Sequence, residues 1–358
     1  MKGLILAGGH GTRLRPLTFT GNKHMIPLCN KPMLFHGFDH LVNAGIKEIG
    51  VVLGPIKEGI EEYLGDGSKF GVNITYIDQS SPKGLAHAVL ISEHFLKNDP
   101  FVMYLGDNLI KQGVKPLIYD YYNNASDCVI CVTKVKNPSQ YGIVELDSKG
   151  NILRLVEKPK KTKSNLALAG VYLFNNSIFE AVKKINPSWR NELEITDAIQ
   201  FLHGEDKRIS IQHIEGWWKD TGRPEDLLEA NQLLLDDLEP KSNVIMEDAS
   251  CIISGKVSIG KNTVLRQNTR IKGPVIIGDN CEIGPNVYIG PYTSIGENVK
   301  ILSGEIEGSI IMQNVIINCN DTRVVDSIIG KRSRLETAQG LLPAGSRFVL
   351  GESTICRL

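Results

Sequence analysis

An aliphatic residue returns at every sixth position in the last third of the chain. The series comprises Ile253, Ile259, Leu265, Ile271, Ile277, Ile283, Ile289, Ile295 and Ile301. A Val, Thr or Cys stands two places before each of them. An α-helix with 3.6 residues per turn cannot keep a period of six on one face, whereas a hexapeptide repeat is typical of a left-handed parallel β-helix. The period therefore predicts a left-handed β-helix domain over residues 241–358.

The period slips after Leu302. Residues 303–309 are predicted to form an inserted turn, because the aliphatic series resumes only at Ile311 and continues through Ile317 and Ile329. We therefore expect the last coils to be less regular than the first.

Residues 1–240 have a different pattern, in which apolar runs of strand length alternate with helical patterns. Strands are predicted over 2–6, 49–53, 72–77 and 101–105, and helices over 33–43, 58–64, 84–96 and 224–235. This alternation predicts an α/β domain with a Rossmann-like, mostly parallel sheet covered on both faces. In such sheets, ligands bind beyond the carboxyl ends of the strands.

The composition excludes several classes of protein. Lys and Arg number 40, as do Asp and Glu, so a general binder of nucleic acid or of an anionic membrane is not expected. No run of 18 apolar residues predicts a transmembrane helix. The apolar run at the start is too short for a signal peptide, so we expect a cytoplasmic protein.

Of the seven cysteines only Cys128 and Cys131 are close, and buried thiols are predicted.

A glycine-rich loop follows the first predicted strand. It contains Gly8, Gly9 and Gly11, and Arg13 comes two residues later. Glycines let a backbone approach a ligand closely and present N–H groups to phosphate, and a guanidinium suits phosphate oxygens. The dinucleotide fingerprint fails because Leu14 stands where its third glycine should be, and no Walker A lysine follows. A tight turn without a ligand is the alternative.

Five charged positions are further candidates. Lys23 follows the glycine loop, and Asp107 follows a predicted strand and a glycine, where a carboxylate could bind Mg²⁺. Pro159 ends a strand beside Glu157 and Lys158. Asp220 precedes the helix predicted over 224–235 and could be a second metal ligand. A solvated lysine and helix-capping aspartates are the structural alternatives.

Zinc and nucleophile motifs are absent from the sequence. The eight histidines show no H-E-x-x-H spacing, and no G-x-S-x-G elbow occurs. All eight precede residue 214, so residues 241–358 contain no histidine.

Taken together, these motifs resemble the sugar-phosphate nucleotidylyltransferase family. The order of elements is similar to that of the long-form glucose-1-phosphate thymidylyltransferases, which carry a β-helix tail. The motifs that carry the resemblance lie at 6–16, 23–27, 79–88, 105–108, 141–145, 156–159, 169–172 and 217–222.

The resemblance implies roles for individual residues. The triphosphate of the nucleotide would be held by Gly8, Gly9, Gly11, Thr12 and Arg13, and its β and γ phosphates by Lys23. The pyrimidine edge would be contacted by Gln79 and Gly84, and Mg²⁺ by Asp107 and Asp220. The hexose would be contacted by Gly142, Glu157 and Val171, and its phosphate by Lys158. Arg13, Lys23 and Lys158 would be the catalytic cations.

One motif departs from the family pattern. A Gln followed by two aliphatic residues and Pro often comes after the lysine in the long-form enzymes. Here the residues are His24, Met25, Ile26 and Pro27. The role of His24 therefore stays open, while Lys23 and Pro27 keep the pattern.

The implied reaction is Mg²⁺-dependent transfer of a thymidylyl group from dTTP to glucose 1-phosphate, which releases pyrophosphate. UTP, or an amino or deoxy sugar, would fit the same motifs. A second, acetyl-transferring activity in the β-helix is disfavoured because such sites use a histidine base. An inactive regulatory homologue is disfavoured because Lys23, Asp107, Lys158 and Asp220 are all present. The tail is expected to assemble the chain into a homo-oligomer.

Overall fold

The computed structural model describes the chain except for residues 58, 243–244, 248, 338–353 and 356–358. Parts of the predicted β-helix range 241–358 therefore lie outside the described residues. Two compact units are present: Met1–Gly11, Gly21–Met25 and Met33–Asp220 form the first, and Thr12–Thr20, Ile26–Pro32 and Thr221–Leu358 the second. The domain boundary predicted at residue 240 falls within the second unit, because helix α8 (Pro224–Asp236) packs there.

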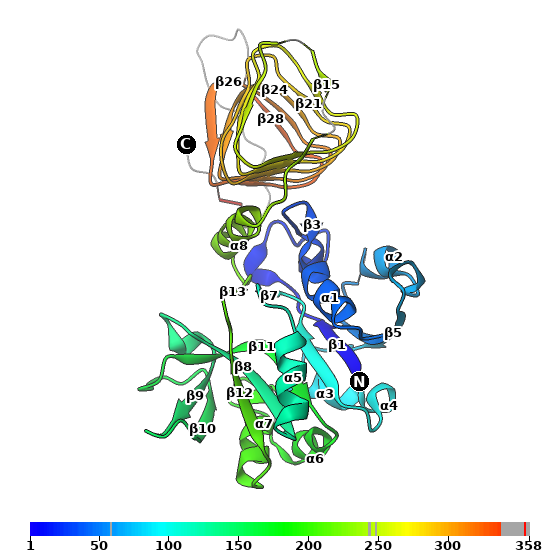
Figure 1. Ribbon diagram of the computed structural model, residues 1–358, viewed down its shortest axis with the longest axis vertical. Helices are drawn as coiled ribbons and strands as arrows, with labels where there is room; N and C mark the ends of the chain where they lie inside the picture. Colours follow the sequence, from blue (N-terminus) through cyan, green and yellow to red (C-terminus); the bar gives the residue numbers. More distant parts are fainter. Residues whose placement is uncertain (58, 243–244, 248, 338–353, 356–358) are drawn as a thin grey trace. The chain divides into compact units, whose positions relative to one another are not determined.

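A nine-stranded sheet organises the first unit, with its main path in the order β10-β9-β11-β6-β1-β4-β5 (Figure 1). Its parallel half comprises β1 (Lys2–Ala7), β4 (Glu48–Leu53), β5 (Asn73–Asp78) and β6 (Phe101–Leu105). Its other strands are β8 (Cys128–Lys134), β9 (Gly142–Leu146), β10 (Ile152–Glu157), β11 (Leu166–Phe174) and β12 (Ile209–His213). Strand β11 runs antiparallel to β6 and β8, while β12 is parallel to β8. The predicted Rossmann-like α/β class is confirmed.

The helices of the first unit cover this sheet. They are α1 (Met33–Asn43), α2 (Ile60–Leu64), α3 (Leu85–Ile91), α4 (Glu93–Leu96), α5 (Lys115–Asn123), α6 (Ser177–Lys184) and α7 (Ile195–Gly204). The single helix predicted over 84–96 is wrong, because the structure divides it at Ser92. The Ser92 hydroxyl donates a hydrogen bond to the Ala88 carbonyl over 2.7 Å, the local competition with helical bonding that serine offers.

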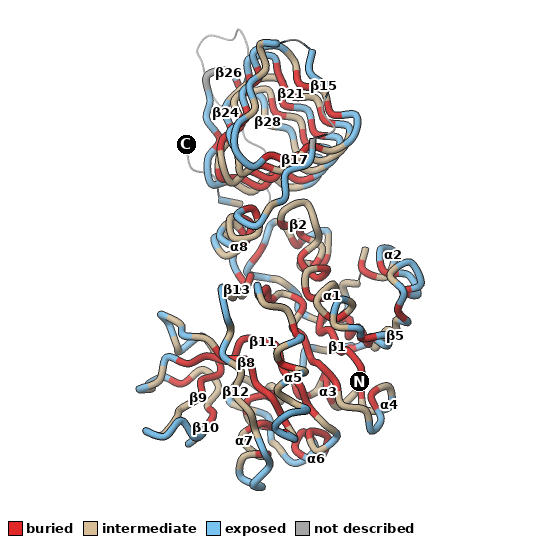
Figure 2. The backbone as a smooth tube through the Cα atoms, in the orientation of Figure 1, coloured by how far each residue is buried: buried red, intermediate tan, exposed pale blue. Residues whose placement is uncertain are grey.

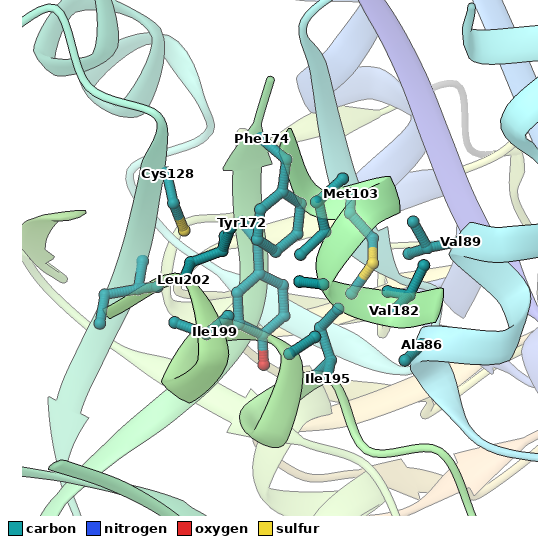
Figure 3. Packing of buried hydrophobic residues seen from close by; sticks show 14 of the residues in the cluster. Ala86, Val89, Met103, Cys128, Tyr172, Phe174, Val182, Ile195, Ile199 and Leu202 are labelled. Carbon is teal, nitrogen blue, oxygen red and sulfur yellow. The ribbon is translucent and has the colours of Figure 1, made fainter. Parts of the chain in front are cut away.

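Apolar cores lie on both faces of the sheet (Figure 2). Along β6, Phe101 and Met103 belong to one core and Val102 and Tyr104 to the other, as the two-residue period of a strand requires. Figure 3 shows the core against α3, α6 and α7, where Met103, Val182 and Ile195 come together. Cys128 and Cys131 on β8 are both buried, on opposite faces.

The second unit contains a parallel β-helix, and the predicted fold class of this region is confirmed. Its first face comprises β14 (Lys241–Ser242), β17 (Val257–Ile259), β20 (Val275–Ile277), β23 (Thr293–Ile295), β25 (Ile310–Ile311) and β27 (Ile328–Ile329). The other faces comprise β15 (Ile245–Met246), β16 (Ile252–Ser254), β18 (Val264–Leu265), β19 (Arg270–Lys272), β21 (Glu282–Ile283), β22 (Tyr288–Ile289), β24 (Lys300–Glu307), β26 (Ile316–Val325) and β28 (Arg334–Glu336). Ile259 stacks on Ile277, which stacks on Ile295. Three hexapeptides thus complete one coil.

Asparagines turn the corners of these coils. Asn262, Asn268, Asn280 and Asn286 have positive φ, a conformation that asparagine tolerates better than most residues. Asn262 Nδ2 donates to Asn280 Oδ1 over 3.2 Å, so equivalent corners are joined between coils.

The inserted turn predicted over 303–309 is largely wrong. Strand β24 continues to Glu307, and Ile306 pairs in register with Ile289. The ladder absorbs the change of period through register shifts on either side of Ser303.

A short hairpin and α8 pack on the β-helix within the second unit. The hairpin pairs β2 (Pro27–Leu28) with β3 (Lys31–Pro32). Asn231 Oδ1 on α8 accepts hydrogen bonds from Cys29 N over 2.8 Å and Ser294 Oγ over 2.7 Å. Asn30 Nδ2 donates to the Ile295 carbonyl over 2.7 Å.

In the described part of the chain, no helix is long and apolar enough to cross a membrane.

Candidate functional site

A cavity of about 240 Å³ opens at the carboxyl ends of β1, β5 and β6. It is lined by Leu6, Gly8, Gly9, Lys23, His24, Gln79, Pro82, Gly84, Leu85, Ala88, Leu105, Asp107 and Glu192. Six predicted site residues are therefore brought together by three strand ends and the loops that follow them. The position agrees with the general rule for ligands of parallel sheets.

Lys23 and Asp107 form an ion pair within this cavity. Asn108 Nδ2 also donates to Asp107 Oδ1 over 3.0 Å. Burial alone would raise the pKa of the Asp107 carboxyl, but the charge of Lys23 and these hydrogen bonds outweigh burial and hold that pKa below its usual range. The lysine therefore keeps a buried carboxylate ionised.

His24 lies beside this pair as a neutral imidazole. The Asn22 side chain donates to the Ile56 carbonyl, so its oxygen faces His24 and accepts from Nδ1 over 2.7 Å. The imidazole is 2% exposed. Burial and the positive charge of Lys23 lower the pKa of His24 from 6.5 to about 3, despite the opposing charge of Asp107. The ring therefore offers an unprotonated Nε2.

Asp220 lies opposite the residue that follows Asp107. Strand β13 (Trp218–Asp220) pairs antiparallel with β7 (Asn108–Ile110), and Asp220 is the partner of Asn108. Among the described residues, no group of three or more His, Cys, Asp or Glu side chains is placed to hold a metal ion. The carboxylates of Asp220 on β13 and Asp107, just before its partner strand β7, nevertheless fit Mg²⁺, which takes one or two protein carboxylates together with substrate phosphates.

Gly84 has a conformation that requires glycine. Its φ is +102°, and a β-carbon there would collide with the Leu193 carbonyl oxygen. Leu193 N donates to the Lys83 carbonyl over 2.8 Å, and Ala86 N donates to the Leu193 carbonyl over 3.0 Å. These bonds fix the start of α3 against the chain before α7, beside Gln79.

A second polar cluster surrounds Glu157. Gly142 is the register partner of Glu157 on β9 and β10. Thr196 Oγ1 donates to Glu157 Oε2 over 2.6 Å, and Arg190 Nη1 lies 3.5 Å from Oε1. Lys158 Nζ is 3.6 Å from the same Oε1. A β-carbon at Gly142 would lie 2.6 Å from Thr196 Oγ1, so glycine leaves room for this hydrogen bond.

Eight of the fourteen predicted site residues are absent from the lining of the cavity, among them Val171, Gly11, Thr12 and Arg13. The Val171 side chain is fully buried in a core, so only its backbone could contact a sugar. Gly11 ends a segment of the first unit, while Thr12 and Arg13 belong to the second. Arg13 lies against Gly222, where a β-carbon would come within 2.8 Å of Nη2.

Several polar residues were missed by sequence reasoning. Thr196 and Arg190 contact Glu157, and Arg190 Nη2 also lies 3.0 Å from each carboxylate oxygen of Glu192. Trp218 Nε1 donates to Asn108 Oδ1 over 2.8 Å. The paired tryptophans before Asp220 were the only local signal for this last contact.

Comparison with protein families gives two matches. Residues 2–237 match the family described as Nucleotidyl transferase. Residues 271–354 match the family described as GMPPB C-terminal domain. The first match covers more than half of the chain and includes every predicted site residue.

Individual proteins resemble the chain over its whole length. Low-salt glycan biosynthesis nucleotidyltransferase Agl11 of Haloferax volcanii is 44% identical, with 100% of each chain covered. A glucose-1-phosphate thymidylyltransferase of Streptomyces antibioticus is 45% identical, with 98% of each chain covered. Among solved structures, a UDP-glucose pyrophosphorylase complexed with UDP-glucose has a TM-score of 0.59 and 29% identity. That comparison covers 66% of this chain and 98% of the other.

Proposed function

The chain belongs to the nucleotidyl transferase family, and from this premise we propose that it transfers a thymidylyl group from dTTP to glucose 1-phosphate. The products are dTDP-glucose and pyrophosphate, which makes the reaction a step in the supply of activated sugars. Support for the base and the sugar comes from the Streptomyces relative, whose name specifies this activity.

One observation carries the proposal: the cavity combines the groups that a nucleoside triphosphate needs. Gly8 and Gly9 offer approachable backbone, Lys23 a cation, Asp107 a carboxylate and Gln79 an amide. In the proposed complex, the glycine loop holds the triphosphate, and Lys23 exchanges Asp107 for the β and γ phosphates. The roles of Thr12 and Arg13 toward the triphosphate rest on the family resemblance alone. Gln79 and Gly84 contact the pyrimidine.

The cluster around Glu157 is proposed to hold the sugar phosphate. Glu157 accepts hydrogen bonds from hexose hydroxyls beside Gly142 and the backbone of Val171, and Lys158 pairs with the phosphate. Thr196 and Arg190 already contact the Glu157 carboxylate, so this carboxylate is oriented before the sugar binds.

The chemistry requires no general base. An anionic phosphate oxygen of glucose 1-phosphate forms a bond to the α-phosphorus of dTTP, and the bond from that phosphorus to the oxygen bridging it to the β-phosphate breaks. The electron pair leaves with pyrophosphate, so no proton has to be transferred. The difficulty is to bring two polyanions together, which Arg13, Lys23 and Lys158 address.

Mg²⁺ is the proposed cofactor, held by Asp107 and Asp220 together with substrate phosphates. When bound, it would neutralise charge that develops on the phosphates. Asp220 on β13 and Asp107, just before the partner strand β7, are a suitable set of donors for this ion.

UTP is the second candidate nucleotide. The similarity to a UDP-glucose pyrophosphorylase favours it, and uracil differs from thymine only by a methyl group. Acetyl transfer is the less supported alternative, since residues 241–358 contain no histidine. We further propose a homo-oligomer assembled through the β-helix and a cytoplasmic location.

A pyrophosphate-release screen tests this function. The purified chain is incubated with Mg²⁺, each of dTTP, UTP, dCTP and ATP, and each of several sugar 1-phosphates. Turnover should be highest with dTTP and glucose 1-phosphate. Lys158→Ala should raise the KM for glucose 1-phosphate strongly and change that for dTTP little. Absence of pyrophosphate release with both dTTP and UTP for every sugar would overturn the proposal.

A further inference from the structure

The amide of Gln79 is held in one orientation by two acceptors. Its nitrogen lies 3.3 Å from the carbonyl oxygen of Gly84 and 3.1 Å from Nδ1 of His87. Because a backbone carbonyl only accepts, the nitrogen of the amide faces Gly84. Both N–H groups of the amide are then in use, and Nδ1 of His87 has to accept one of them. The imidazole therefore carries its proton on Nε2.

The amide oxygen of Gln79 is consequently turned toward the glycine loop. A β-carbon at Gly8 would lie 2.8 Å from Oε1, and Gln79, Gly8 and Gly84 all line the cavity. Among the residues that the structure describes, none donates a hydrogen bond to this oxygen. An acceptor without a donor therefore faces the space proposed for the base.

His87 is placed by a rigid element. Ala86 and Val89 of α3 point into the core in Figure 3, which fixes the rotation of this helix. The neutral form of the imidazole is favoured because burial and the charge of Lys83 lower the pKa of His87. Both features keep an accepting nitrogen beside the Gln79 amide.

We propose that His87 is a positioning residue for base selection, which holds the Gln79 amide with its oxygen toward the nucleotide. Thymine and uracil carry an N–H at N3 that this oxygen can accept, whereas cytosine carries a lone pair there. Two acceptors facing each other disfavour binding. The site thus selects pyrimidines with an imide N–H, an inference that rests on the proposed nucleotidyl transfer.

Removal of the imidazole acceptor leaves only the Gly84 carbonyl to orient the amide. The amide can then rotate and present its N–H groups to the base, which relaxes the rejection of cytosine. His87→Asn offers a carbonyl oxygen near the place of Nδ1 and should retain the orientation. Comparison of an apolar substitution at His87 with His87→Asn separates the effect of the hydrogen bond from the effect of side-chain volume.

The test is the ratio of kcat/KM for dTTP to that for dCTP in the wild type, His87→Phe, His87→Leu and His87→Asn. We expect the ratio to fall about five- to tenfold in the Phe and Leu variants, through a higher KM for dTTP and a lower KM for dCTP, and to be restored in His87→Asn. His94→Phe is the matched control, because this exposed histidine on α4 is outside the cavity lining.

Either of two results would overturn the inference: an unchanged ratio in both apolar variants, or an equal loss with both nucleotides in all three variants. A wild type without turnover on dTTP and UTP would overturn the proposed function and this inference with it. Normal wild-type turnover together with an unchanged ratio would overturn the inference alone.

Discussion

Lys23 and Asp107 are 84 residues apart in the chain and form an ion pair where the ends of β1 and β6 meet. Both side chains are largely buried, at 11% and 18% exposure. A buried charge without a partner is costly, so each stabilises the other in the absence of ligands. The pair also places a cation and a carboxylate, which is a side chain that can bind a metal ion, at the same strand ends.

Lys23→Met should lower kcat/KM for dTTP by about 100- to 1,000-fold, because a preorganised charge at the proposed leaving phosphates is lost. The KM for glucose 1-phosphate should change less than the KM for dTTP. Steady-state pyrophosphate release measures both constants. Lys149→Met, at an exposed turn, is the matched control and should behave like the wild type. A Lys23→Met variant with wild-type kcat/KM would contradict the assignment.

Removal of divalent ions with EDTA should abolish turnover, and added Mg²⁺ should restore it. Asp220→Asn should raise the Mg²⁺ concentration for half-maximal activity by about tenfold or more, because one of two carboxylate donors is lost. Asp206→Asn, at an exposed turn with positive φ, is the control. Equal Mg²⁺ requirements for Asp220→Asn and the wild type would show that Asp220 does not bind the metal ion.

Local patterns predicted the parallel half of the fold well. The expected bounds of α1 and β6 agree with the structure, since apolar periodicity and flanking residues set both ends. The register shift near residue 303 and the helix break at Ser92 were harder to predict from local patterns. The first depends on register between coils, and the second on a single hydroxyl that bonds to the helix backbone.

The polar partners of Glu157 could not be predicted from local patterns. Thr196 is 39 residues away in the chain and Arg190 is 33. Thr196 meets Glu157 only because α7 packs against β10 in the tertiary fold, and Arg190 lies in the chain just before α7. By contrast, Gly8 and Asp107 each come just after a predicted strand, so the topology of a parallel sheet was enough to group them. Lys23 follows the glycine loop and was assigned to the same site only by the family resemblance.

Thr196→Val should raise the KM for glucose 1-phosphate about tenfold. The threonine hydroxyl donates to a carboxylate, and a hydrogen bond of that kind contributes about 1.5–3 kcal/mol. Without it, Glu157 is less well oriented toward the sugar. Thr196→Ser keeps the hydroxyl and should stay within about threefold of the wild type. Equal KM values for the sugar phosphate in Thr196→Val and the wild type would show that the hydroxyl does not orient Glu157.

His24 should make the folded protein less stable in mild acid. Its pKa is 6.5 in an exposed setting and about 3 when folded, so the unfolded chain binds the extra proton between these values. Stability from this group is complete above pH 6.5 and declines as the pH falls toward 3. At pH 5 the loss is about 2 kcal/mol.

Urea unfolding at pH 7.5 and pH 5 measures this effect. His24→Gln carries no titrating group, so its free energy of unfolding should fall by about 2 kcal/mol less than that of the wild type between the two pH values. The same pH dependence in both proteins would show that the imidazole is protonated when folded or is not buried as described.

The interior of the β-helix provides the last prediction. Ile283 is fully buried and Ile252 is 52% exposed, although both lie on strands of the same β-helix. Ile283→Ala should lower the free energy of unfolding by about 2–5 kcal/mol through lost burial and the cavity that remains. Ile252→Ala makes the same chemical change at an exposed position, where substitutions usually cost about 0.5 kcal/mol or less.

Chemical denaturation of both variants at low protein concentration tests the period of six directly. The aliphatic series contains position 283 and excludes position 252, so the two effects should differ by more than about 1.5 kcal/mol. Equal destabilisation would mean that the repeat does not determine which side chains fill the interior, since hydrophobic residues at both positions would then be equally protected from water.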